Sequence, residues 1–451
     1  MRILYIHQYF CTRQGRSGSR SYEFAKHLVR HGHRVTMLTS TSELSDVQIP
    51  PEKRVHRFAV EGIDVVAVRV SYAQHMGTLR RIGSFLHFMA LSTWIACRTR
   101  GHDLVFATST PLTVGVPGVC ASLCLRVPLV FEVRDLWPEA PIQIGVLRNR
   151  LLIRLLRHFE RVVYARSAHI IALSPGMRDG VVATGVSEAK VTVIPNCSDV
   201  DLFRPGNAPA GLVAALGLEG RFVVVHAGSM GAANGLDVLV DAATCLQAAG
   251  ESEVLFLLLG QGAEMERLLA RVRAQELDNV RAYKSVPRGE VPDYLRASHV
   301  CLVLFRDLPV LATNSPNKLF DALAAGRPVI VNSNGWTREL VETYGVGRYA
   351  KPGSGAALAA EILWLRDHDK ARRTMGQRAR QLAERRFDRA TLAAQFEAVL
   401  RSAAGVSGHE VAEPTVSHAD PAQAEARPAI AGKGATPYTP GAGPADVLAS
   451  R

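Results

Sequence analysis

The sequence predicts an α/β protein built from two Rossmann-like, doubly wound domains that face each other across a cleft. Its 451 residues exceed the length of one ordinary domain, and 47% hydrophobic against 21% charged residues is typical of a globular chain. Short apolar runs alternate with segments of helical period in two successive series. Apolar runs separated by helices are typical of parallel strands that are covered on both faces.

The first series begins at the start of the chain. A strand predicted at 2–6 leads through a glycine-containing loop at 11–19 into a helix at 20–31, which ends at Gly32. The later strands end in polar or small residues, where open α/β sheets bind ligands. They are predicted at 35–38, 65–68, 103–107, 128–133 and 170–173.

The second series predicts a further parallel sheet, with helices such as 236–248 and 263–275 between its strands. Its strands are predicted at 222–227, 255–259, 280–283, 300–304 and 329–331.

These series define an N-terminal domain at 1–200, to which 388–402 crosses back, and a C-terminal domain at 201–387. From 403 to 451 the composition changes to Ala, Gly, Pro, Ser and Thr with dispersed charge. Such a segment buries too little apolar surface to order itself, so we predict a disordered tail.

The excess positive charge of the chain lies almost entirely in its first half. Residues 1–200 hold 25 Lys and Arg against 14 Asp and Glu, whereas 201–451 hold 28 against 27. This asymmetry indicates an anionic partner for the N-terminal half, such as lipid head groups or a phosphorylated acceptor. No nucleic-acid recognition motif accompanies it, so we expect no nucleic-acid partner.

Cysteine usage and apolar runs indicate a cytoplasmic protein. The seven cysteines form no C-x-x-C pair, and their odd number favours free thiols in a reducing compartment. We expect neither an export signal nor a spanning helix, because the chain opens on a core strand and its apolar stretches stay below about 18 residues.

Two segments of the first half combine apolar residues with arginines. Ile82 to Cys97 is an apolar stretch with Arg at both ends, and 148–166 holds six Arg among Leu, Ile and Val. Basic amphipathic segments of this kind suit the surface of an anionic membrane. Either segment could instead be a helix packed on the N-terminal sheet. For 80–100 the two interpretations are equally supported, whereas for 148–166 membrane attachment is favoured.

Glycine-rich loops open both halves. Gly15 and Gly18 precede the first helix with G-x-x-G spacing, which suits a phosphate at a helix N-terminus but not the dinucleotide motif. An ordinary turn explains this loop equally well. The second half repeats the arrangement after its first strand, which makes a phosphate site more plausible. Its loop contains Gly228, Ser229, Gly231 and Asn234.

A charged cluster follows the strand at 128–133. It contains Glu132, Arg134, Asp135 and Glu139 at a strand end that faces the ligand crevice. An acid beside an arginine acts as a base, as a ligand of an acceptor hydroxyl or as a structural ion pair. We expect Asp135, with Arg134, to belong to the catalytic machinery.

The segment 314–331 carries the sharpest motif. Ser315 is predicted to cap a helix that begins at Pro316, so Asn317 and Lys318 lie in its first turn. A cation there opposes the helix dipole unless a bound anion compensates it. Asp321 lies one turn further on the same face. A lysine for phosphate and a carboxylate for sugar hydroxyls suit a nucleotide-sugar.

Taken together, these motifs resemble the retaining GT-B glycosyltransferases of glycosyltransferase family 4. The subgroup they resemble most is the fucosamine-transferase-like proteins that assemble bacterial O-antigen, capsule and exopolysaccharide. The resemblance covers about residues 1–402. It is carried by Arg-Asp-Leu-Trp-Pro at 134–138, Ile-Pro-Asn at 194–196, the glycine loop at 228–235 and Ser-Pro-Asn-Lys-x-x-Asp at 315–321.

The resemblance implies a donor held mainly by the C-terminal domain. Lys318 would contact phosphate, Asp321 the ribose hydroxyls, and the backbone near 283–286 the base. Asp135 would lie beside the acceptor and the anomeric carbon. The diphosphate would meet Gly228, Ser229, Gly231, Asn234 and Asn317, and from the opposite domain Gly15 and Gly18.

The chain departs from the family pattern at the residues that bind sugar and phosphate. The paired glutamates of the family correspond to Thr313 and Asp321, and its usual lysine after the glycine loop corresponds to Asn234. A histidine often found before the crevice acid is Arg134 here. Arg20, Arg134 or Lys318 are candidates to supply the missing positive charge.

We therefore expect a retaining, hexosyltransferase-type enzyme at the inner face of the cytoplasmic membrane. Its donor would be a UDP-sugar carrying a hexose or N-acetylhexosamine, and its acceptor a polyprenyl-linked or other glycan. No cofactor or metal is expected, because no D-x-D lies at a plausible strand end and Asp199-Val-Asp201 falls in the interdomain linker. A nucleotide-sugar 2-epimerase and a non-catalytic membrane-recruiting subunit are the alternatives.

Overall fold

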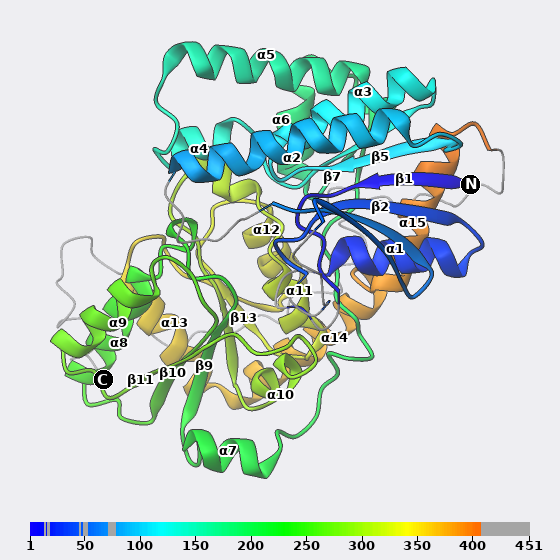
Figure 1. The fold of residues 1–451 in the computed structure, drawn as a ribbon. Coiled ribbons are helices and arrows are strands. Elements are labelled where there is room, and N and C mark those ends of the chain that lie inside the picture. Colours follow the sequence, from blue (N-terminus) through cyan, green and yellow to red (C-terminus); the bar gives the residue numbers. More distant parts are fainter. Residues whose placement is uncertain (13–14, 16–18, 45–46, 48–52, 71–77, 407–451) are drawn as a thin grey trace.

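The computed structural model describes residues 1–12, 15, 19–44, 47, 53–70 and 78–406, and it confirms two α/β domains with a parallel sheet in each. In Figure 1 the N-terminal domain lies above the C-terminal domain. Gly18 and the predicted tail beyond residue 406 lie outside the described residues.

The N-terminal sheet has eight strands in the order β3-β4-β2-β1-β5-β6-β7-β8. All neighbours pair in parallel except β3 and β4. The strands are β1 (Arg2–Ile6), β2 (Arg34–Ser40), β3 (Val55–Val60), β4 (Ile63–Val68), β5 (Leu104–Thr108), β6 (Leu129–Val133), β7 (His169–Ala172) and β8 (Val191–Val193).

Helices cover both faces of this sheet. Helices α2, α3, α5 and α6 pack on one face around Phe88 and Tyr164, and α1 and α15 pack on the other around Phe24 and Phe396. The helices of this domain are α1 (Arg20–Arg30), α2 (Thr78–Arg98), α3 (Gly115–Leu125), α4 (Glu139–Gln143), α5 (Arg150–Arg166), α6 (Pro175–Val182) and α15 (Arg389–Ala403).

The C-terminal sheet has six parallel strands in the order β11-β10-β9-β12-β13-β14. They are β9 (Phe222–Ala227), β10 (Val254–Leu259), β11 (Val280–Tyr283), β12 (Val300–Val303), β13 (Val329–Val331) and β14 (Gly347–Tyr349). The helices are α7 (Ala210–Leu216), α8 (Asp237–Ala248), α9 (Met265–Ala274), α10 (Val291–Arg296), α11 (Asn317–Ala324), α12 (Trp336–Tyr344), α13 (Gly355–Asp367) and α14 (Asp369–Arg386).

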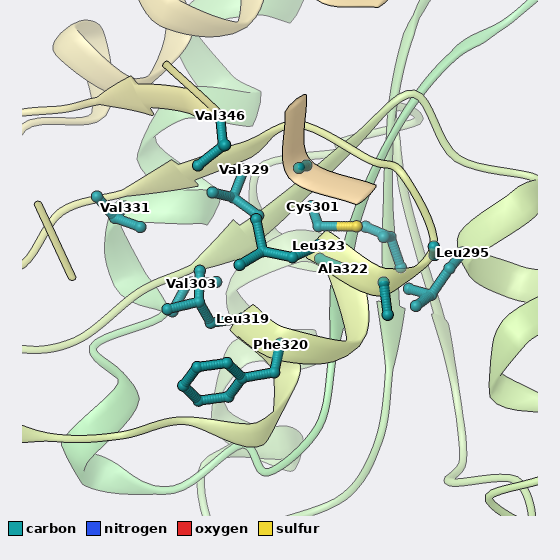
Figure 2. Close-up of a cluster of buried hydrophobic side chains, with 14 of the residues drawn as sticks. Leu295, Cys301, Val303, Leu319, Phe320, Ala322, Leu323, Val329, Val331 and Val346 are labelled. Atoms are coloured by element: carbon teal, nitrogen blue, oxygen red, sulfur yellow. The ribbon is translucent and has the colours of Figure 1, made fainter. Parts of the chain in front are cut away.

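The packing of α11 shows how this core positions a helix. Leu319 and Leu323 of α11 lie on the side of Val303 and Val329 of the sheet, as Figure 2 shows, and Phe320 belongs to the same buried cluster. Close packing of these apolar faces fixes the position of α11 on the sheet. The polar residues of its first turn are therefore held at the carboxyl edge of the strands.

The predicted strands are present, but the sequence patterns missed β3, β8 and β14. Strand β3 turns into β4 through Glu61 and Gly62, whose positive φ values of 46° and 83° suit a tight hairpin turn. Strands β8 and β14 are three residues long, too short for a periodic signal.

The chain crosses between the domains a second time after α14. Ser198 accepts a bond from the backbone of Arg389 at 3.0 Å and donates its own N–H to Phe387 at 3.1 Å. Helix α15 then packs on α1, with the ring centroids of Phe24 and Phe396 4.9 Å apart. Among the described helices, none is both long and apolar enough to cross a membrane.

A buried ion pair joins four segments of the N-terminal domain. Arg20 and Glu132 lie 2.9 Å apart, with side chains 2% and 0% exposed. Arg20 also donates to the carbonyls of Ile194 and Pro195 at 2.9 and 2.6 Å, and Thr108 donates to Glu132 at 2.7 Å. The sequence-based expectation placed Glu132 in the crevice cluster and Arg20 among the candidate cations for the ligand. Both are instead structural residues, because they form an ion pair with each other inside the core.

Replacing Arg20 alone should destabilise this domain strongly. We expect Arg20→Met to lower the free energy of unfolding by about 3–5 kcal/mol, because Glu132 is left buried without its partner. Chemical denaturation followed by circular dichroism measures the loss.

The matched control is Arg157→Met. Arg157 pairs with Glu139 at 3.1 Å, but these side chains are 53% and 37% exposed. Exposed pairs contribute up to about 1 kcal/mol, so this variant should stay close to the parent chain. Equal losses for the two variants would contradict the structural role of Arg20.

Candidate active site

A cleft of about 570 Å³ lies between the two domains. Its walls are the loops that follow β1, β5 and β6 in the N-terminal domain, and β9, β10 and β12 with the start of α11 in the C-terminal domain. Open α/β sheets bind ligands at this carboxyl edge. Of the sequence-predicted residues, the cleft brings together Arg134, Asp135, Gly228, Ser229, Asn234, Asn317, Lys318 and Asp321.

The loop after β9 approaches Lys318 closely at Gly228. Gly228 has φ of +143°, and a Cβ there would lie 3.1 Å from Cε of Lys318. A Cβ at Gly260, in the loop after β10, would overlap the carbonyl oxygen of Gly228. Glycine at both positions therefore keeps the backbone of this wall bare and open to a ligand.

Asn234 folds back into its own loop. Its side-chain oxygen accepts a bond from the backbone N–H of Gly231 at 3.3 Å, and it is almost fully buried. Ser229 lines the cleft, whereas Gly231 is not part of the cleft lining. Asn234 thus shapes the loop, and it brings no charge to the place where the family pattern has a lysine.

Lys318 is the cation of the C-terminal wall. Its ammonium lies 3.2 Å from Nε2 of His226, and among the described residues no carboxylate forms an ion pair with it. Burial lowers the pKa of Lys318 to about 7. Burial and the nearby Lys318 also hold the pKa of His226 well below its ordinary value, so this imidazole is neutral. A bound anion would restore the charge of Lys318.

The start of α11 differs by one residue from the prediction. The helix begins at Asn317, and Ser315 does not cap it. The hydroxyl of Ser315 instead accepts the backbone N–H of Asn196 at 3.1 Å, and its carbonyl accepts the Asn196 amide at 2.6 Å. The interdomain linker therefore holds this end of α11, which leaves the N-terminus of α11 at the cleft.

Asp321 is largely occupied by protein partners. Arg288 donates to both of its oxygens, at 2.8 and 3.1 Å, and Ser198 donates to Oδ1 at 2.9 Å. A carboxylate has about four acceptor sites, so one remains, on Oδ2. The sequence motifs did not single out Arg288. It arrives from the loop before α10 and lines the cleft beside Asp321.

Asp135 faces the cleft from the N-terminal wall. Burial raises its pKa, although a 2.8 Å bond from the hydroxyl of Thr110 and the charge of Arg134 oppose that rise. A carboxylate with a raised pKa accepts a hydrogen bond from a hydroxyl more strongly. Its position fits contact with a bound hydroxyl group.

His7 is a second residue that the motifs did not single out. Arg134 donates to its Nε2 at 3.2 Å. Burial and the charge of Arg134 hold the pKa of His7 well below its ordinary value, so the ring is neutral with its proton on Nδ1. Nδ1 is buried and has no partner among the described residues. His7 therefore lines the cleft as a neutral ring whose Nδ1 is buried at the end of β1.

Two further sequence-predicted positions do not line the cleft. Gly15 is buried, and its N–H donates to the carbonyl of Thr12 at 3.2 Å. Thr313 lies against the N-terminal domain, where Ser174 donates to its carbonyl and its Cγ2 would lie 2.9 Å from a Cβ at Gly176. The residue that replaces the family's first glutamate thus forms part of the contact between the domains.

The comparisons with known proteins match each domain separately. Residues 17–197 match the family described as "Glycosyl transferase 4-like domain", and residues 213–382 match "Glycosyl transferases group 1". No curated protein matches the chain significantly.

Solved structures share the fold at low identity. Anabaena HepE in complex with UDP-glucose is 20% identical with a TM-score of 0.66, over 89% of this chain and 100% of its own. Sucrose-phosphate synthase from Thermosynechococcus elongatus is 19% identical with a TM-score of 0.71, over 90% and 100%. A putative UDP-N-acetylglucosamine 2-epimerase from Listeria monocytogenes is 12% identical with a TM-score of 0.58, over 90% and 97%.

The two matched families cover both domains, and the fold agrees with them. The chain belongs to the GT4-type GT-B family of glycosyltransferases.

Proposed function

We propose that this protein is a retaining glycosyltransferase that transfers a hexose or N-acetylhexosamine from a UDP-sugar. The observation that carries the proposal is Lys318, a buried lysine at the start of α11 that lacks a carboxylate partner among the described residues. A diphosphate beside it would supply the missing counter-charge and meet the positive end of α11. Both HepE and an Escherichia coli structure in the same comparison were solved with UDP-sugars or their analogues.

The diphosphate would lie between Lys318 and the bare backbone at Gly228. The loop amides and Lys318 would stabilise the charge that develops on the departing UDP, so no metal or cofactor is required by this scheme. Arg288 adds a second cation near the cleft, although Asp321 neutralises part of its charge.

The nucleoside would lie against Asp321 and the loop after β11. The one open acceptor site on Asp321 suits a single ribose hydroxyl, and Arg288 holds the carboxylate in position. Ser285 and Val286 line the same side of the cleft, where backbone groups would meet the base.

The acceptor would enter from the N-terminal wall. Asp135 would orient its hydroxyl, and the neutral ring of His7, held by Arg134, would line the same wall. We propose attack on the same face from which UDP departs, with no covalent intermediate on the enzyme.

We further propose that the acceptor is lipid-linked or polysaccharide and that the protein binds the cytoplasmic membrane surface peripherally. Helices α2 and α5 each bury one face on the sheet and expose apolar residues on the other, along the top of Figure 1. The exposed residues include Leu86, Trp94, Leu151 and Leu155. Arg150, Arg154, Arg157 and Arg161 are exposed on α5. Each basic residue near anionic lipid contributes about 1 kcal/mol.

An epimerase is the main alternative, because the Listeria structure shares this fold. It would convert a UDP-sugar without any acceptor, whereas a transferase consumes acceptor and releases UDP. A non-catalytic subunit would do neither.

Removing the Lys318 ammonium should weaken UDP binding. We expect Lys318→Met to raise the Kd for UDP about tenfold to a hundredfold, as for a lost hydrogen bond to a charged group. Isothermal titration calorimetry measures the Kd for UDP. Lys351→Met is the control, because Lys351 is exposed and outside the cleft. Equal affinity of all three chains for UDP would refute the donor site.

UDP binding should also depend on pH with a definite sign. The free protein has a Lys318 pKa of about 7, and a bound diphosphate raises it. Below pH 7 the lysine is charged in both states. Above pH 7 binding takes up a proton, so the affinity should fall about tenfold per pH unit. A flat profile from pH 7 to 9 in the parent chain would contradict the role of Lys318, and Lys318→Met should give that flat profile.

Membrane binding should depend on the exposed apolar residues of α5. The purified chain is expected to pellet with anionic vesicles at low salt, and Leu151→Asp with Leu155→Asp should abolish pelleting. Val406→Asp changes another exposed apolar residue, away from α5, and should have no effect. Pelleting that is unchanged in the double variant would refute this surface.

A further inference from the structure

Outside the cleft, three histidines surround one carboxylate where α1 meets α15. Nε2 of His27 and Nδ1 of His31 lie 3.0 and 2.6 Å from the same oxygen of Glu397, Oε2. Nε2 of His33 lies 3.0 Å from the other oxygen, Oε1. The proposed transfer reaction uses none of these four residues.

The carboxylate is held with one oxygen toward the histidine pair. Oε1 of Glu397 accepts bonds from His33 and, at 3.3 Å, from Arg401. Oε2 is thereby left to His27 and His31. Partners that orient a ligating carboxylate in this way are usual behind metal ions.

The histidine pair has the spacing of a helical metal site. His27 and His31 are four residues apart, one turn of α1, and their ring centroids lie 3.9 Å apart. His27 and Glu397 are mostly buried, but the side chain of His31 is 50% exposed, so an ion can enter from solvent.

We propose that His27, His31 and Glu397 bind a divalent transition-metal ion of the zinc class. Their three ligand atoms lie within 4.8 Å of one another. Ligands about 2.1 Å from a tetrahedral ion lie roughly 3.4 Å apart, so small side-chain rotations suffice. Two imidazoles and a carboxylate suit Zn²⁺ better than Mg²⁺ or Ca²⁺, and water would complete the coordination.

The bound ion would tie the return crossing to the N-terminal domain. It joins α1 to α15, which reaches this domain from the C-terminal domain through α14. Binding requires both imidazoles to be deprotonated at the ligating nitrogen, and any protons there pass to solvent. The ion would stabilise the docking of α15 and leave the donor cleft unchanged.

Zinc binding to the full-length chain, prepared without a histidine tag, tests the proposal. We expect Zn²⁺ to raise the Tm until one equivalent is bound and EDTA to reverse the rise. Co²⁺ should develop the visible absorption bands of a four-coordinate site. His31→Gln and Glu397→Gln should each weaken zinc binding tenfold or more.

For each chain, the Tm without zinc is subtracted from the Tm with zinc. This difference removes any effect that the substitution itself has on the Tm of the zinc-free chain. His158→Gln is the control, because His158 is exposed on α5, away from the cluster. It should keep the full increment. Failure of the parent chain to bind zinc, or an equal increment in parent, His31→Gln and Glu397→Gln, would overturn the site and show a hydrogen-bonded helix contact only.

Discussion

The segment 194–199, which leads from the first domain to the second, is the constraint on which the rest of the structure depends. Arg20 holds its first two carbonyls from inside the N-terminal core. Asn196 binds Ser315, two residues before α11, and Ser198 binds both the Asp321 carboxylate and the backbone of the return crossing. One short segment thus bonds to the N-terminal core, to α11 and to the return crossing. The two sheets therefore present their carboxyl ends to a single cleft.

The electrostatics of the cleft follow from this arrangement. Burial of α11 places Lys318 in a desolvated position next to a neutral histidine, whereas Asp321 is neutralised by Arg288. Asn234, which stands where the family pattern has a lysine, carries no charge. Within the described residues, Lys318 therefore provides the positive charge of this wall that has no carboxylate partner. This favours the binding of an anion in the cleft.

Burial patterns explain why much of the fold was predictable from the sequence. Fully buried strands such as β10 leave continuous apolar runs, while short edge strands such as β14 leave none. In the site, the spacing of Lys318 and Asp321 within one helix was predictable. Arg288 was not, because local patterns do not specify which loops meet. Arg20 was misassigned to the cleft, since its sequence context does not reveal a buried partner.

Part of the basic excess and one family position lie away from the cleft. The basic excess of the N-terminal half lies in part on α5, beside exposed leucines, and Thr313 contributes to the domain contact instead of the cleft lining. Asp135 and His7 line the opposite, N-terminal wall of the cleft. In the proposed reaction, α11 would hold the donor and the loops after β1 and β6 would meet the acceptor.

A structure of the chain with UDP bound tests the donor site most directly. The β-phosphate should lie within hydrogen-bond distance of Nζ of Lys318 and of the backbone at Gly228, with the ribose next to Asp321. UDP bound elsewhere, or bound in the cleft while Lys318 keeps only its contact with His226, would contradict the central role of Lys318.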